Sequence, residues 1–158
     1  MKLALAAMIA AGLGIGFVLP VGRSASPASA QVGAEAGAAA ETRLARAPSG
    51  HFHATALVNG QPVEFVVDTG ATTVALTVED ARRIGLDFNP AQFEIIGSGA
   101  SGPARGQEVA LERVSLDGRE VRTLRGAVLE GLDVSLLGQA YLSRIGSVEM
   151  SGDEMVLR

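Results

Sequence analysis

The residue best placed to do chemistry is Asp68, which stands between two apolar runs. It follows Val66 and Val67, whose β-branched side chains favour a buried strand. A carboxylate at the end of a buried strand costs free energy unless another group pairs with it. Thr69 adds a hydroxyl, and Gly70 permits a tight turn and close approach of a backbone or ligand. The pattern indicates a functional carboxylate, and an aspartate that caps its own turn is the structural alternative.

Other kinds of catalytic group are scarce in this chain of 158 residues. It has no cysteine, so neither a disulfide nor a thiolate nucleophile can form. Lys2 is the only lysine, which excludes Schiff-base chemistry from the body of the protein. His51 and His53 lie on one face of an expected strand, and two histidines without a third ligand make a weak metal site. Carboxylates remain as the catalytic groups, and we expect neither a metal nor a cofactor.

The charge of the chain argues against nucleic acid as a partner. The formal net charge is −4 at pH 7. The first 49 residues hold four basic and two acidic groups, so the remainder carries nine basic and fifteen acidic groups, a net charge of −6. A nucleic-acid-binding surface needs a basic patch or stripe, and this sequence shows none.

The N-terminal segment has the pattern of an export signal. Lys2 precedes an apolar run at residues 3–19, slightly shorter than the ~20 residues of a typical spanning helix. Residues 28–30 (Ala-Ser-Ala) offer a small-x-small site for a signal peptidase. We expect residues 1–30 to be a cleaved signal peptide or a retained membrane anchor, with an exported, periplasmic or otherwise extracytoplasmic body. Residues 31–49, rich in Ala and Gly, are expected to form a flexible linker.

Residues 50–158 have the pattern of short strands separated by turns. Asn59-Gly60 and Asp117-Gly118 are signals for two-residue hairpin turns. Thr77, with Asp80 three residues later, predicts the start of a two-turn helix that Gly85 ends. Apolar alternation predicts strands at 51–58, 62–68, 73–76, 93–96, 109–116, 120–129, 134–138, 147–150 and 155–157. We expect the last of these strands to be an exposed edge that is open to pairing.

Three stretches resemble known segments of one enzyme family. Residues 65–71 resemble the active-site loop of retropepsin-like (clan AA) aspartic proteases, in which a hydrophobic pair precedes Asp-Thr-Gly-Ala. Residues 136–144 are similar to the hydrophobic-hydrophobic-Gly segment that leads into a helix behind that loop. Residues 79–86 resemble the short helix that follows the loop in the exported or membrane-anchored bacterial branch. Several matched stretches in the right order identify the family more specifically than any single stretch does.

The resemblance implies an all-β fold, a closed acid-protease barrel with one or two short helices that functions as a homodimer. It places a flap, the hairpin that closes over bound peptide, at the glycine-rich stretch after residue 96. This sequence lacks the Ala-Asn-Gly that relatives commonly carry there. The implied site residues are Asp68 as the catalytic group, Thr69, Gly70 and Ala71 in its loop, Gly99, Ala100 and Ser101 in the flap, and Leu137 and Gly138 behind the loop.

A single Asp-Thr-Gly implies that two chains form one site. Aspartic protease chemistry uses two carboxylates that share a proton. Two unit charges ~4 Å apart repel by about 4 kcal/mol at an effective dielectric constant of 20, so one of the two stays protonated. Asp117 is assigned to its turn, and Asp133 has no apolar approach and no following glycine. A two-fold homodimer would supply the second Asp68.

We therefore predict an aspartic endopeptidase that hydrolyses a peptide or protein substrate. One alternative is a catalytically weak exported β-domain that binds peptides or a protein partner through the same groove, which the altered flap favours. The other alternative takes residues 68–72 as the Asp-x-Gly-x-Thr phosphate loop of actin-like and sugar-kinase ATPases. The chain is short for that group and lacks a glycine-lysine phosphate loop.

Overall fold

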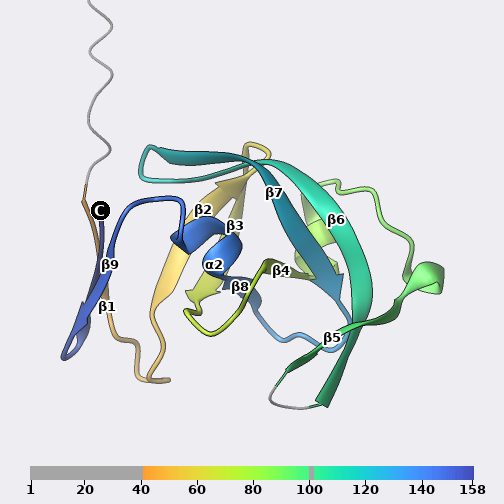
Figure 1. Ribbon diagram of the computed structural model, residues 1–158, viewed down its shortest axis with the longest axis horizontal. Coiled ribbons are helices and arrows are strands. Elements are labelled where there is room, and N and C mark those ends of the chain that lie inside the picture. Colours follow the sequence, from red (N-terminus) through yellow and green to blue (C-terminus); the bar gives the residue numbers. More distant parts are fainter. Residues whose placement is uncertain (1–40, 100–101) are drawn as a thin grey trace, which may run out of the picture. The chain divides into compact units, whose positions relative to one another are not determined.

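Strands dominate the part of the protein that the computed structural model describes, residues 41–99 and 102–158 (Figure 1). The elements are β1 (Thr42–Ala45), β2 (His53–Val58), β3 (Gln61–Val67), β4 (Val74–Thr77), α1 (Val78–Arg83), the 3-10 helix η1 (Pro90–Gln92), β5 (Glu94–Gly99), β6 (Gly102–Leu116), β7 (Arg119–Leu129), β8 (Ser135–Leu137), α2 (Gln139–Leu142), β9 (Val148–Ser151) and β10 (Glu154–Leu157). The expected signal or anchor, at residues 1–30, lies outside the described residues and stays a prediction. No helix within the described ranges has the length and apolar character needed to cross a membrane.

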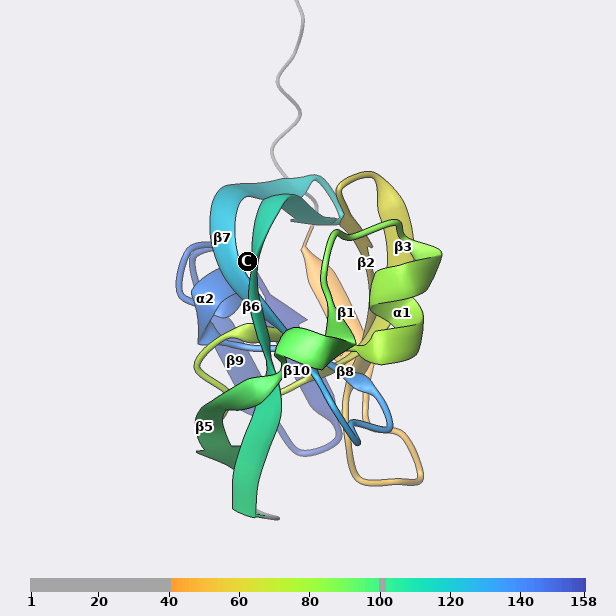
Figure 2. The ribbon, with the colours of Figure 1, turned by 90° about the vertical axis from the view of Figure 1, so that its right-hand side faces the viewer.

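Six strands close into a barrel in the order β2-β3-β8-β4-β7-β6. Closure comes from the pairing of β2 with β6, through Leu57 opposite Ser115 and Val58 opposite Val114. β5 extends the sheet beyond β6, and Figure 2 shows α1 and α2 on different sides of the barrel. Large side chains fill the interior, and the largest of those that are fully buried include Tyr141, Phe65, Leu76, Leu111 and Leu137. The predicted all-β closed barrel with short helices is confirmed.

The predicted hairpin turns follow from local chemistry. Asn59 and Asp117 have positive φ angles of 50° and 47°, and the glycine after each also has a positive φ. These are the backbone angles of tight hairpin turns, which Asn-Gly and Asp-Gly adopt at little cost. At the start of α1, the Thr77 hydroxyl accepts a hydrogen bond from the Asp80 N–H at 3.0 Å. The turns and the helix cap therefore lie where the sequence predicts them.

The two ends of the described chain meet in a second sheet, in the order β1-β10-β9. This sheet corrects two expectations. Residues 42–45, which we assigned to a flexible linker, form β1 and pair with β10, Thr42 opposite Leu157 and Ala45 opposite Glu154. The last strand, which we expected to be an exposed edge, lies in the middle of the sheet. Both differences arise because β1 and β10, which pair with each other, lie more than a hundred residues apart in the chain. No local sequence pattern therefore predicts their pairing.

Buried Arg119 joins this terminal sheet to the barrel. Its guanidinium donates to the Thr42 hydroxyl at 3.1 Å and to the carbonyl oxygen of Leu157. The Thr42 hydroxyl donates in turn to Asp117 at 2.6 Å. The Tyr141 hydroxyl donates to the Arg119 carbonyl at 2.8 Å, and burial raises the pKa of Tyr141 to about 12. A buried charge is tolerated only with such partners, so these bonds hold β1 and β10 in place.

A second polar cluster connects α1 with β8. The fully buried Ser135 hydroxyl donates to the Asp80 carboxylate at 2.6 Å and accepts from the Thr77 N–H at 3.1 Å. Partial burial by itself would raise the pKa of Asp80. Hydrogen bonds from Ser135, Arg83 and Thr77 outweigh burial, so the pKa lies below its ordinary value. The charged form of Asp80 is therefore part of the folded structure.

We expect Thr42→Val to lower the free energy of unfolding by about 1–3 kcal/mol, because it keeps the shape but removes the hydroxyl between Arg119 and Asp117. Thr55→Val, at an exposed position of β2, is the matched control and should change stability by less than about 0.5 kcal/mol. Urea denaturation measures both. Equal stabilities for the two variants would contradict the role of the Arg119 cluster.

We expect Ser135→Ala to cost about 1–3 kcal/mol of stability at pH 7. Because the folded pKa of Asp80 is lowered, its contribution is present above the unfolded pKa and is lost as pH falls through the folded pKa. The difference in free energy of unfolding between the parent and Ser135→Ala should therefore become smaller below about pH 4. Denaturation curves across pH test this, and a difference that grows in acid would refute it.

Candidate active site

Parallel pairing of β3 with β8 sets the position of Asp68. Val66 lies opposite Leu136, and Val67 lies opposite Leu137. Asp68 follows at the end of β3, and its N–H donates to the carbonyl oxygen of Leu137 at 3.1 Å. The chain then leaves the sheet and returns as β4, so the loop between β3 and β4 lies beside β8 and α2 (Figure 1). A buried strand thus presents the carboxylate at its exposed end.

Within the loop, the Asp68 carboxylate is oriented by its own turn. Its Oδ1 accepts a hydrogen bond from the Gly70 N–H at 2.8 Å. The Ala71 N–H donates back to the Asp68 carbonyl at 3.3 Å, which closes the turn. The side chain of Asp68 is half-buried, whereas Thr69 and Gly70 are exposed. The carboxylate is therefore held at one oxygen while the residue stays accessible.

The N-terminus of α2 supports the loop from behind. The N–H of Gln139 donates to the Ala71 carbonyl at 2.8 Å, and the N–H of Ala140 donates to the Thr72 carbonyl at 3.0 Å. Gly138 makes this approach feasible, since a Cβ there would lie 2.2 Å from the Thr73 carbonyl oxygen. The first N–H groups of a helix need acceptors, and here the loop provides them.

Asp68 opens onto a pocket of about 540 Å³. One wall is the loop with β4 and β8, and another is the β5–β6 hairpin, paired as far as Gly99 opposite Gly102. The segment after β7 forms the third wall, which no local sequence pattern predicted. The lining residues are Asp68, Gly70, Ala71, Thr72, Ala75, Ser98, Gly99, Gly102, Pro103, Ala104, Leu129, Glu130, Gly131, Leu132 and Leu136.

The structure gathers most of the predicted site residues in this one place. Asp68, Gly70, Ala71 and Gly99 line the pocket. Leu137 and Gly138 are buried and contact the loop through the hydrogen bond and close approach given above. Thr69 is exposed, and it does not line the pocket. The predicted flap residues Ala100 and Ser101 lie outside the described residues.

The charged groups of the pocket are few. Glu130 is the other carboxylate in the lining, and it pairs with Arg105 at 3.0 Å. Among the described residues, no three His, Cys, Asp or Glu side chains gather as they would around a metal ion. His53 instead lies 3.3 Å from Glu64 through its Nδ1. The chemistry that the pocket offers is that of one oriented carboxylate, which can take a proton or bind a water.

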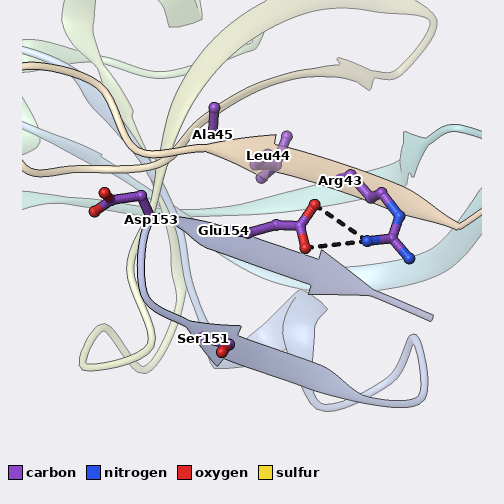
Figure 3. A pocket seen from close by; sticks show the side chains of 6 residues that line it. All are labelled: Arg43, Leu44, Ala45, Ser151, Asp153 and Glu154. Atoms are coloured by element: carbon purple, nitrogen blue, oxygen red, sulfur yellow. Dashed lines mark hydrogen bonds and ion pairs between the residues drawn. The ribbon is translucent and has the colours of Figure 1, made fainter.

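A second hollow, of about 440 Å³, lies against the terminal sheet (Figure 3). The view shows Arg43 reaching both carboxylate oxygens of Glu154, at 3.1 and 3.0 Å. Asp153, also in the lining, pairs with Arg46 at 3.3 Å. The acidic side chains that line this second hollow are thus engaged in surface ion pairs. The second hollow shares no lining residue with the Asp68 pocket. We therefore assign the chemistry to the Asp68 pocket.

Known proteins resemble this chain in sequence and in fold. A family model described as "gag-polyprotein putative aspartyl protease" matches residues 54–144, which include the Asp68 loop and Gly138. The chain is 40% identical over 121 residues to an uncharacterized protein in the cobV 5′ region of Sinorhizobium sp., and 36% identical over 118 residues to an uncharacterized protein of Rickettsia prowazekii. These alignments cover 75% and 74% of this chain but 52% and 51% of those proteins. The chain spans about half the length of the curated relatives it matches.

Two solved structures resemble the barrel. A retropepsin-like aspartic protease from Rickettsia conorii matches with a TM-score of 0.63 and 34% identity, over 75% of this chain and 90% of that one. The EIAV protease in complex with the inhibitor HBY-793 matches with a TM-score of 0.53 and 22% identity, over 64% and 93% of the two chains, which is a likeness of fold. None of these matches supports the ATPase alternative. The family model matches a region that includes the Asp68 loop, and the Rickettsia structure has a similar fold. We conclude that the chain belongs to the retropepsin-like aspartic proteases.

Proposed function

We propose that this protein is an aspartic endopeptidase, in which the Asp68 carboxylates of two identical chains activate a water for attack on a peptide bond. The observation that carries the proposal is the setting of Asp68. It is half-buried, it is fixed at one oxygen by the Gly70 N–H at 2.8 Å, and it faces a pocket walled by a β-hairpin. This arrangement provides an accessible and oriented carboxylate.

The chemistry divides two roles between two identical acids. One carboxylate, ionised, takes a proton from the attacking water, and the other, protonated, donates to the oxygen of the scissile carbonyl. Two such groups ~4 Å apart repel by about 4 kcal/mol at an effective dielectric constant of 20. One proton is therefore shared between the two acids. Such general acid and base catalysis contributes about 10²–10⁴-fold to a rate.

The second acid of the pair has to come from another chain. Asp117 accepts a hydrogen bond from Thr42 at 2.6 Å in its turn, and Asp133 lines a separate hollow with Glu79 and Asp80. Neither lines the Asp68 pocket, and Glu130, the other carboxylate that does, is paired with Arg105 at 3.0 Å. Thr69 is exposed beside Asp68, so its hydroxyl is free to contact the loop of a second copy across a two-fold axis. We infer that the homodimer, rather than the single chain, is the active form.

An extended peptide is the substrate that suits this pocket. Glycines at Gly70, Gly99 and Gly102 leave room for another backbone to approach. β5 is the edge strand of its sheet, and its end at Ser98 and Gly99 lines the pocket, so an extended chain can form main-chain hydrogen bonds there. Main-chain recognition of this kind tolerates varied side chains, which suits an endopeptidase.

We expect Asp68→Asn to fold as the parent does and to lose at least about 10²-fold in peptide cleavage. The amide oxygen can still accept from the Gly70 N–H, but the amide cannot act as a base. Asp133→Asn, at an exposed position outside the pocket, is the matched control and should cleave as the parent does. Hydrolysis of a peptide library at several pH values measures both. Full activity in Asp68→Asn would overturn the assignment.

Mixing the two proteins tests whether two chains form one site. When inactive Asp68→Asn is added to an equal amount of parent, random exchange leaves about half of the parent chains in parent–parent dimers. Activity should therefore fall to about half, with no loss when Asp68→Asn is replaced by an unrelated protein. Light scattering on the same samples measures the size of the assembly. Unchanged activity in samples whose subunits exchange would show that one chain suffices.

A further inference from the structure

The peptide group between Thr69 and Gly70 is held on both of its edges. Its N–H, from Gly70, donates to Oδ1 of Asp68 at 2.8 Å. Its carbonyl oxygen, from Thr69, accepts from the side-chain amide of Gln139 at 2.9 Å. No cis peptide bond occurs in the described chain, so this C=O and N–H point in opposite directions. Gln139 and Asp68 therefore form hydrogen bonds to opposite edges of the same planar peptide group.

We propose that Gln139 is a positioning residue for the Asp68 carboxylate and acts on it through the Thr69–Gly70 peptide plane. The inference rests on the aspartic protease function proposed above and assigns to that site a residue outside the Asp-Thr-Gly motif. Gln139 does not line the pocket, and it reaches the carboxylate only through the peptide. Its contribution is to fix how the peptide N–H faces Asp68.

Two physical effects follow from this arrangement. Rotation of the peptide plane would turn the Gly70 N–H away from Asp68, and the Gln139 hydrogen bond resists that rotation. A hydrogen bond to the carbonyl also polarises the peptide, which strengthens its N–H as a donor. A stronger donor stabilises the ionised carboxylate and lowers its pKa. Loss of the Gln139 amide should therefore raise the apparent pKa values of the Asp68 pair.

The main chain of Gln139 is anchored independently of its side chain. Its N–H donates to the Ala71 carbonyl at 2.8 Å, and its carbonyl accepts from the Ser143 hydroxyl at 2.6 Å. The side chain is exposed, so exchanging it creates no cavity. Substitution can therefore remove the amide donor while α2 and its contacts to the loop stay in place.

The other charged groups near the site do not share this role. Glu130, the other titratable residue in the pocket lining, is paired with Arg105 at 3.0 Å. β4, β8 and α2 contain no Asp, Glu, His, Lys or Arg, and the Tyr141 hydroxyl of α2 is turned to the Arg119 carbonyl. The β5–β6 residues in the lining are Ser, Gly, Pro and Ala. On β2, which pairs with β3, His53 lies opposite Val66 and is 3.3 Å from Glu64. An effect of changing Gln139 on Asp68 can thus be attributed to the peptide contact.

Gln139→Met tests the inference, because methionine keeps the length and the helix propensity but cannot donate. We expect kcat to fall about threefold to tenfold with little change in KM, as for the loss of one hydrogen bond. The pH profile of kcat/KM should move to higher pH. Gln92→Met, at an exposed position of η1 outside the pocket, is the matched control and should leave both unchanged.

Gln139→Glu supplies a donor only in acid. The introduced carboxyl can donate to the Thr69 carbonyl when it is protonated, but it only accepts when it is ionised. The kcat of this variant relative to the parent should be close to one in acid and should fall as pH rises through the ordinary glutamate pKa, about 4.3. A ratio that is constant with pH would contradict the inference, whatever the stability of the variants.

Carbon-13 NMR titration of the Asp68 carboxyl separates this inference from the proposed function. In Gln139→Met the apparent pKa values should be higher than in the parent, whether or not a substrate has been found. If the parent cleaves peptides and Asp68→Asn does not, but Gln139→Met matches the parent in kcat and in titration, the positioning role is wrong and the protease stands. If no parent dimer cleaves any peptide, the protease proposal fails, and the titration still decides the role of Gln139.

Discussion

The site depends on a set of backbone hydrogen bonds that the Asp68 loop makes with the end of β8 and the start of α2. The Asp68 N–H reaches the Leu137 carbonyl, and the loop carbonyls of Ala71 and Thr72 accept from the first N–H groups of α2. Loop and helix each satisfy polar groups that the other leaves open. An irregular loop can hold a carboxylate in a fixed orientation because its own backbone is paired in this way.

Glycine at position 138 allows the loop and the start of α2 to come close enough for these hydrogen bonds. A Cβ there would lie 2.2 Å from the Thr73 carbonyl oxygen and 2.6 Å from that of Ala71. Contacts this short do not occur in folded proteins, so any other residue would push the loop away from α2. The hydrophobic-hydrophobic-Gly stretch and the Asp-Thr-Gly stretch are therefore two halves of one structure, although about seventy residues separate them.

The rest of the fold keeps these two halves in register. β3 and β8 run parallel, which requires a long connection between them, and that connection supplies the β5–β6 hairpin and the far wall of the pocket. Arg119 holds the terminal sheet against the barrel, and the Ser135–Asp80 contact holds α1 against β8. These buried polar contacts fix the scaffold around a loop whose own surface stays exposed.

Features that depend on a few neighbouring residues could be read from the sequence. The strand that ends in Asp68, the Asn59 and Asp117 turns and the Thr77 cap of α1 were found this way, because their chemistry lies within three or four residues. Only the tertiary structure decided where β1 pairs, that β10 is central, that residues 129–132 wall the pocket and that Gln139 reaches Thr69. Each of these features depends on a contact between segments that are far apart in the chain. The residue types of one segment do not indicate which distant segment it contacts.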